Sequence, residues 1–94
     1  MKILVDFDNT VQLWGEPKTG AIDVLRKWMH EGHVITIWTS RPEADFPAIY
    51  SWFESYGIKP NAIVRKPYCD LYIDDRSVNP SIGWERLDAI VTGE

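Results

Sequence analysis

The chain has 94 residues and a formal net charge of −4 at pH 7, with 45% hydrophobic residues and no cluster of Lys or Arg. This length suits one domain spanning residues 1–94, and the missing basic stripe excludes stable nucleic-acid binding. The lone cysteine, Cys69, excludes an internal disulfide, and no stretch resembles a signal peptide or a membrane span, so we expect a soluble cytoplasmic protein.

Apolar periodicity and turn residues predict alternating strands and helices along the chain. A short apolar run at 3–5 is typical of a strand buried in a parallel sheet, and Asp45 is a plausible N-cap. The expected strands lie at 3–5, 34–38, 62–64 and 71–73. The expected helices lie at 21–31, 46–56 and 84–91, and loops are expected at 12–18 and 77–83.

This alternation predicts an α/β fold in which right-handed crossovers build a small parallel sheet with helices on its faces, a three-layer Rossmann-like sandwich. One junction is short. Only about six residues separate the strands at 62–64 and 71–73, whereas a parallel crossover usually takes a dozen or more. Either the strand at 62–64 is very short, or the connection runs extended across one face of the sheet.

The first predicted strand ends in two carboxylates, Asp6 and Asp8. If the strand continues to Asp8, period-two alternation points both side chains to the same side. Two like charges repel there, and a cation such as Mg²⁺ would relieve the repulsion. The alternative is that residues 6–10 form only a polar turn, with Asn9 as a turn residue.

A second acidic pair, Asp74 and Asp75, follows the predicted strand at 71–73. The carboxyl ends of parallel strands open on the same edge of a sheet, where ligands bind. Carboxylates from two such strand ends therefore predict a metal site made of Asp6, Asp8, Asp74 and Asp75.

These motifs resemble those of the haloacid dehalogenase superfamily of phosphatases and phosphotransferases. The first family motif matches Asp6-Phe7-Asp8-Asn9-Thr10, and the second, a strand ending in Thr or Ser, matches residues 35–40. Lys66 stands where the family's lone lysine is expected, and Asp74-Asp75 match its acidic pair. The resemblance spans residues 2–76 and implies the family's core fold without a cap domain.

The resemblance implies an Mg²⁺-dependent phosphate monoester hydrolase. Asp6 would attack phosphorus to form an aspartyl-phosphate, and Asp8 would protonate the leaving oxygen and then activate water. The backbone carbonyl of Asp8 would coordinate the metal, and Asp74 and Asp75 would complete its ligand set. The sequence leaves open which of these two acids binds the metal directly.

The resemblance also implies a phosphate-binding role for Thr39, with Ser40 as the competing candidate, and a charge-neutralising role for Lys66. The alternatives are that Thr39 caps the next turn and that Lys66 faces solvent. Arg41 and Arg76 could each reach a substrate anion or form surface salt bridges.

No interval along the chain has room for a cap, so we expect an open site. Trp14 lies in the only loop able to cover it, and a homodimer could use surplus aromatic surface. The candidate substrates are nucleotide and sugar phosphates, and the acidic pair followed by Arg resembles the deoxynucleotidase branch. The alternative to an enzyme is a phosphate- or metal-binding regulatory module that keeps the site without useful turnover.

Overall fold

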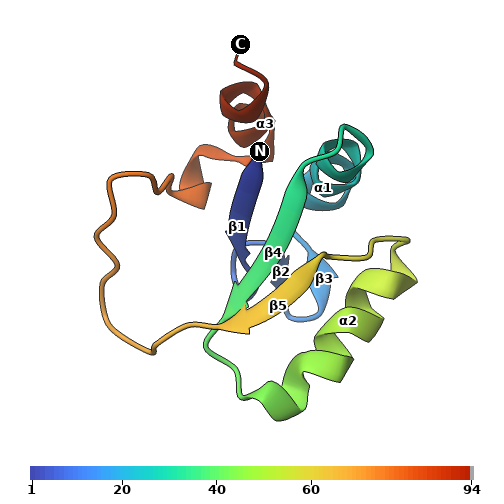
Figure 1. Ribbon diagram of the computed structural model, residues 1–94, viewed down its shortest axis with the longest axis vertical. Coiled ribbons are helices and arrows are strands. Elements are labelled where there is room, and N and C mark those ends of the chain that lie inside the picture. Colours follow the sequence, from blue (N-terminus) through green and yellow to red (C-terminus); the bar gives the residue numbers. More distant parts are fainter. Residues whose placement is uncertain (94) are drawn as a thin grey trace.

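A three-stranded parallel sheet forms the centre of the protein (Figure 1), in a computed structural model that describes residues 1–93. Its strands are β1 (Lys2–Asp6), β4 (Val34–Thr39) and β5 (Ala62–Arg65), in the order β1-β4-β5. The parallel sheet that the sequence predicts is therefore confirmed, with three strands, and β1 has one edge without a neighbouring strand.

One face of this sheet is buried and the other is largely open. Val5, Ile37 and Ile63 are aligned across the three strands and are all buried. Their neighbours on the opposite face are not, since Leu4 is 51% exposed and Val64 is 41% exposed. The strands thus alternate between core and solvent, a pattern more usual for antiparallel sheets, because parallel sheets are normally covered on both sides.

Two helices cover the buried face. Helix α1 (Ala21–His30) contributes Leu25 and Trp28 to the core, and helix α2 (Phe46–Ser55) contributes Ile49 and Phe53. Figure 1 shows both helices on the same side of the strands. Strands added in one direction with crossovers of the same hand place their helices on one face.

The described residues form two layers, a sheet and the helices on its buried face, and the expected three-layer sandwich stays a prediction. A third layer needs a strand on the far side of β1, so that the direction of strand addition reverses. The sequence predicts such a strand at 71–73, and the structure does not contain it.

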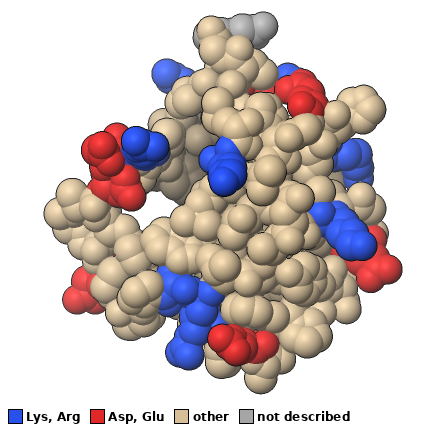
Figure 2. Space-filling view, in the orientation of Figure 1, with Lys and Arg blue, Asp and Glu red and all other residues tan. Residues whose placement is uncertain are grey.

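Residues 67–79 instead form an exposed segment without helix or strand. Leu71 is 71% exposed and Ile73 is 89% exposed, and no backbone hydrogen bond joins described residues 67–78 to the sheet. The segment arcs away from the strands in Figure 1, and Figure 2 shows an opening between it and the rest of the surface. The total exposed area of 6506 Å² accordingly exceeds the roughly 5,600 Å² expected for a compact protein of this mass.

The remaining elements lie near the predicted positions, with two corrections. The loop at 12–18 contains a small hairpin, β2 (Gln12–Leu13) and β3 (Glu16–Pro17). Asp45 makes no side-chain capping bond, because it closes a 3₁₀ turn (Glu43–Asp45) directly before α2. No helix among residues 1–93 is long and apolar enough to cross a membrane.

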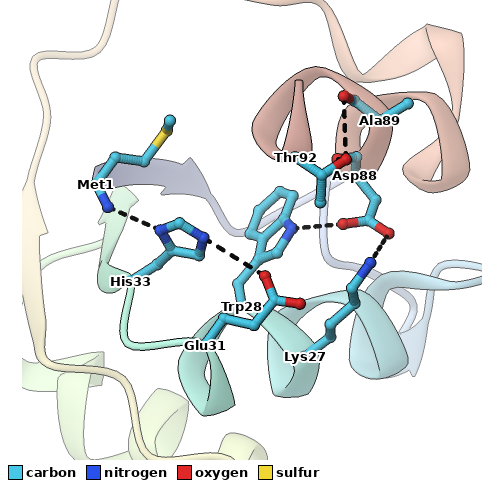
Figure 3. A network of polar contacts seen from close by, with 8 residues as sticks. All are labelled: Met1, Lys27, Trp28, Glu31, His33, Asp88, Ala89 and Thr92. Carbon is cyan, nitrogen blue, oxygen red and sulfur yellow. Dashed lines mark hydrogen bonds and ion pairs between the residues drawn. The ribbon is translucent and has the colours of Figure 1, made fainter. Parts of the chain in front are cut away.

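Helix α3 (Trp84–Thr92) follows a 3₁₀ turn (Pro80–Ile82) and packs against α1. The rings of Trp84 and Trp28 lie 5.7 Å apart, and Asp88 accepts hydrogen bonds from the indole of Trp28 at 2.9 Å and from Lys27 at 2.7 Å (Figure 3). The hydrogen bond from Lys27 lowers the pKa of Asp88. This carboxylate joins the two helices through one charged and one neutral donor.

We expect Asp88→Ala to destabilise the protein by about 1–3 kcal/mol, because the part-buried indole N–H of Trp28 loses its acceptor. A lowered carboxyl pKa stabilises the fold above the usual value near 4, and this contribution disappears as pH falls through the lowered pKa. The difference in Tm between wild type and variant should therefore shrink in acid. Asp23→Ala is the control, since that exposed acid forms only a 3.7 Å pair with Arg26. Equal losses in both variants would contradict the bridging role of Asp88.

Candidate active site

The chain turns sharply where β1 ends. The backbone carbonyl of Phe7 accepts hydrogen bonds from the N–H groups of Val11, at 2.9 Å, and Gln12, at 3.3 Å. Asn9 has a φ of 60°, a left-handed conformation that Asn tolerates better than most residues. Residues 6–10 are thus a tight polar turn, as one reading of the sequence proposed, and this turn positions Asp6 and Asp8.

Asp6 is held by a cation and a hydroxyl. Lys66 donates to Oδ1 at 2.6 Å, and the hydroxyl of Thr10 donates to Oδ2 at 2.9 Å. Lys66 follows directly after β5, and its backbone N–H binds the carbonyl of Thr39 at the end of β4. Its ammonium also lies 5.1 Å from the centre of the Trp38 ring. Lys66 therefore points into the site and is not a solvent-facing lysine, as its side chain is only 12% exposed.

Asp8 has a separate set of donors. The guanidinium of Arg41 donates through Nε at 2.9 Å and through Nη2 at 2.5 Å, and Gln12 donates at 2.6 Å. The hydrogen bond to Asp8 raises the pKa of Arg41. The carbonyl oxygen of the Gln12 side chain accepts from the N–H of Gly15, which ties Asp8 to the β2–β3 hairpin.

The repulsion expected between the two carboxylates is thus relieved by two basic side chains, one for each acid. β1 ends at Asp6, so the strand does not continue to Asp8, which was the condition for both side chains to point to the same side by strand alternation. Asp6 pairs with Lys66 from β5, and Asp8 pairs with Arg41 from the loop after β4. The sequence left open whether Arg41 reaches a substrate anion or forms a surface salt bridge. In the structure it forms a salt bridge, and the partner is a residue of the site.

Thr39 is almost completely buried, at 1% exposure, at the end of β4. Its hydroxyl oxygen accepts the backbone N–H of Arg41 at 3.1 Å, so it caps the following turn. The hydroxyl proton remains available for donation to another oxygen. Ser40 is half-buried, and its phosphate-binding role stays a prediction.

The acidic pair does not reach this site. Asp74 and Asp75 lie in the exposed segment 67–79, where Asp74 accepts the backbone N–H of Arg76 at 2.7 Å. The structure does not bring these acids beside Asp6 and Asp8, because it has no strand at 71–73 to carry them, and their metal-binding role stays a prediction. No group of three or more acidic, histidine or cysteine side chains among residues 1–93 is arranged to hold a metal ion.

In this arrangement Asp6 and Asp8 are each paired with a basic side chain, whereas a hard cation needs several free oxygen ligands. Mg²⁺ dependence therefore stays a prediction. Arg76 lies beside the acidic pair in the exposed segment, where its backbone N–H donates to Asp74. Its role in substrate binding stays a prediction.

Trp14 lies at the tip of the β2–β3 hairpin and is 90% exposed. Trp14 and Gly15 form the two-residue turn, and both have positive φ, 56° and 81°. Such turns favour Asn and Gly, so a tryptophan is an unusual choice there. The indole N–H of Trp52 in α2 donates to the Gly15 carbonyl at 2.9 Å, which fastens the tip.

Sequence reasoning missed Gln12 and Trp52. Gln12 is only 6% exposed although polar. Its spacing of four residues from Asp8 was the available signal, but a single amide in a loop is common.

Comparison of the chain with protein-family models, with curated protein sequences and with solved structures gives no significant match. The resemblance to the haloacid dehalogenase superfamily therefore stays a prediction that rests on the motif residues.

Proposed function

We propose that the protein is a phosphate monoester hydrolase that uses Asp6 as its nucleophile. The observation that carries this proposal is the position of the Asp6 carboxylate at the carboxyl end of the edge strand β1, bound by Lys66 at 2.6 Å and by Thr10 at 2.9 Å. Ligands of open α/β sheets bind at this end of the strands. Lys66 can stabilise the negative charge that builds up on phosphoryl oxygens in the transition state.

In the proposed reaction an Asp6 oxygen forms a bond to phosphorus while the bond from phosphorus to the leaving oxygen breaks. Asp8 gives its proton to that oxygen, which leaves as an alcohol. Water then attacks the phosphorus of the aspartyl-phosphate, Asp8 takes the proton from the water, and inorganic phosphate and free Asp6 are released.

Asp8 must carry a proton in the first step. Its three donors from Arg41 and Gln12 suit an ionised carboxylate. On this proposal, arrival of a phosphate dianion draws the guanidinium of Arg41 from Asp8 to the phosphoryl oxygens, since Arg binds both groups with the same planar geometry. Asp8 is then free to take up a proton.

The proposal includes Mg²⁺ dependence, which requires residues 67–79 to move. On this proposal the short connection after β5 runs extended across one face of the sheet, residues 71–73 pair with the free edge of β1, and Asp74 and Asp75 end at the same edge of the sheet as Asp6. The same move would supply the strand missing from a Rossmann-like core of the haloacid dehalogenase type. When bound, the cation would supply positive charge at the phosphoryl oxygens.

A phosphate-binding module without turnover is the second candidate. The two closed ion pairs, Asp6 with Lys66 and Asp8 with Arg41, favour it, because both carboxylates are already neutralised without a metal. Hydrolysis of p-nitrophenyl phosphate with and without Mg²⁺ separates the candidates. Saturable turnover supports the enzyme, whereas phosphate binding by calorimetry without turnover supports the module.

We expect Trp14→Ala to raise KM for nucleotides roughly tenfold, since stacking of a base on an aromatic ring contributes about 1–3 kcal/mol. The kcat for p-nitrophenyl phosphate should change little. Trp14→Phe, which keeps a ring at the hairpin tip, is the matched control and should retain most of the affinity. An unchanged KM in Trp14→Ala would show that the exposed indole does not touch the substrate.

A further inference from the structure

A hollow of about 170 Å³ lies between the β2–β3 hairpin and helix α2. Phe7 and Ile49 form its apolar floor, and Trp52 stands on one side with its indole fixed by the bond to Gly15. The rings of Phe7 and Trp52 meet edge to face, with centres 5.3 Å apart. Phe7 and Trp52 thus give the hollow two aromatic rings, and Ile49 adds aliphatic surface.

The hollow is adjacent to Asp8 and not to the partners of Asp6. Both residues that donate to Asp8, namely Gln12 and Arg41, line it. Lys66 and Thr10, which bind Asp6, do not. A substrate with phosphorus at Asp6 and its leaving oxygen at Asp8 would therefore direct its leaving group into this hollow.

The chemistry of the walls selects the kind of leaving group. Aromatic and aliphatic carbon covers most of the lining, and the Arg41 guanidinium lies 5.3 Å from the centre of the Phe7 ring. A guanidinium and an aromatic ring both stack on flat π systems. The volume lies below the roughly 300–1,000 Å³ of sites for drug-sized ligands, so one compact ring fits and a large group does not.

A second hollow, of about 390 Å³, offers the opposite chemistry. It lies between the turn after β1 and residues 79–84, and Lys18, Asn79 and Ser81 are among the residues that line it. Such polar groups would suit the hydroxyls of a sugar. Neither donor of Asp8 lines it, so it is less well placed to receive the group that Asp8 protonates.

We propose that the hollow beneath the hairpin is the leaving-group subsite and that the preferred substrates are phosphate monoesters whose leaving group presents a flat aromatic or heteroaromatic ring. This inference rests on the proposed hydrolase function for its chemistry, but the subsite itself can be tested by binding alone. It places Phe7 and Trp52 as specificity-determining residues, with the ring held between α2 and the hairpin.

Ala48 provides a direct test, because it lines the hollow and is exposed on α2. Ala48→Leu fills the space with a good helix former. Binding of phenylphosphonate and of methylphosphonate, which differ only by the ring, is measured by calorimetry. We expect the wild type to bind phenylphosphonate at least fivefold more tightly, and Ala48→Leu to lose this preference. Ser81→Leu, which fills part of the second hollow, should keep it.

The kinetic arm compares kcat/KM for p-nitrophenyl phosphate with that for glycerol 2-phosphate. We expect Ala48→Leu to lower this ratio about tenfold and Ser81→Leu to leave it within twofold. Equal binding of the two phosphonates by the wild type would overturn the proposal, as would a loss of preference in Ser81→Leu and not in Ala48→Leu. Absence of turnover together with a ring preference abolished by Ala48→Leu would refute the hydrolase and leave the subsite standing.

Discussion

Asp6→Asn should lower turnover of p-nitrophenyl phosphate at least a hundredfold, which corresponds to about 2.7 kcal/mol of activation free energy. The amide cannot form the aspartyl-phosphate, and it also removes the charge that Lys66 pairs with at 2.6 Å. The side chain of Asp6 is 31% exposed, and the amide oxygen of Asn can still accept a hydrogen bond from Lys66, whose side chain is 12% exposed, so the fold should stay intact. Steady-state kinetics and a thermal melt measure the two effects separately.

Asp23→Asn is the matched control for this variant, because it removes one exposed carboxylate on α1 that pairs with Arg26 at 3.7 Å and not with a residue of the site. It should keep turnover near that of wild type. Residual activity above about a hundredth of wild type in Asp6→Asn, with the fold intact, would remove Asp6 from the nucleophile role and favour the binding module.

Chelation should have the second large effect. We expect EDTA to lower turnover at least tenfold and added Mg²⁺ to restore it, because monoester hydrolysis is among the slowest uncatalysed reactions and needs several positive groups at the phosphoryl oxygens. The double variant Asp74→Asn/Asp75→Asn should lose activity to a similar extent. Asp70→Asn, in the same exposed segment, is the matched control and should not.

Chelation tests whether a metal is needed, and the double variant tests whether Asp74 and Asp75 hold it. Full activity in EDTA would refute the metal role altogether, and Lys66 and Arg41 would then be the cations of the site. Loss of activity in EDTA but not in the double variant would show that the metal is held without the acidic pair. The proposed rearrangement of residues 67–79 toward β1 would then be unnecessary for metal binding.

The elements that local pattern determines were predicted closely. The apolar faces of 21–31 and 46–56 gave helices that end within one residue of the expected positions, because each has one stripe that must be buried. The sequence also predicts a strand at 71–73, but the short junction before it conflicts with an ordinary parallel crossover, and a strand also needs a partner. Only about six residues connect it to 62–64, and the structure leaves it exposed. The hydrophobic pattern of a segment shows which side chains it can bury. It does not show whether the connection before it is long enough to place the segment in the sheet.

The site was predictable where motif residues follow strands directly. Asp6, Thr39 and Lys66 end or follow β1, β4 and β5, and the parallel sheet brings them together. The donors of Asp8 were harder to assign. Arg41 could equally have formed a surface pair, and Gln12 reaches Asp8 only because the turn folds back around the Phe7 carbonyl. Such contacts depend on backbone geometry that residue spacing does not reveal.

The hydrogen bond from the Trp84 indole to the Thr10 carbonyl, 3.0 Å long, joins α3 to the turn that carries the candidate nucleophile. Thr10 in turn donates to Asp6. These residues are far apart in the sequence, so a ribosome completes the turn long before it makes its support. A nascent chain that ends before residue 84 would lack this one support for the turn that carries Asp6, although the hydrogen bonds within the turn could already form. The last tie on the candidate nucleophile would then be made only when α3 emerges and packs on α1, late in synthesis.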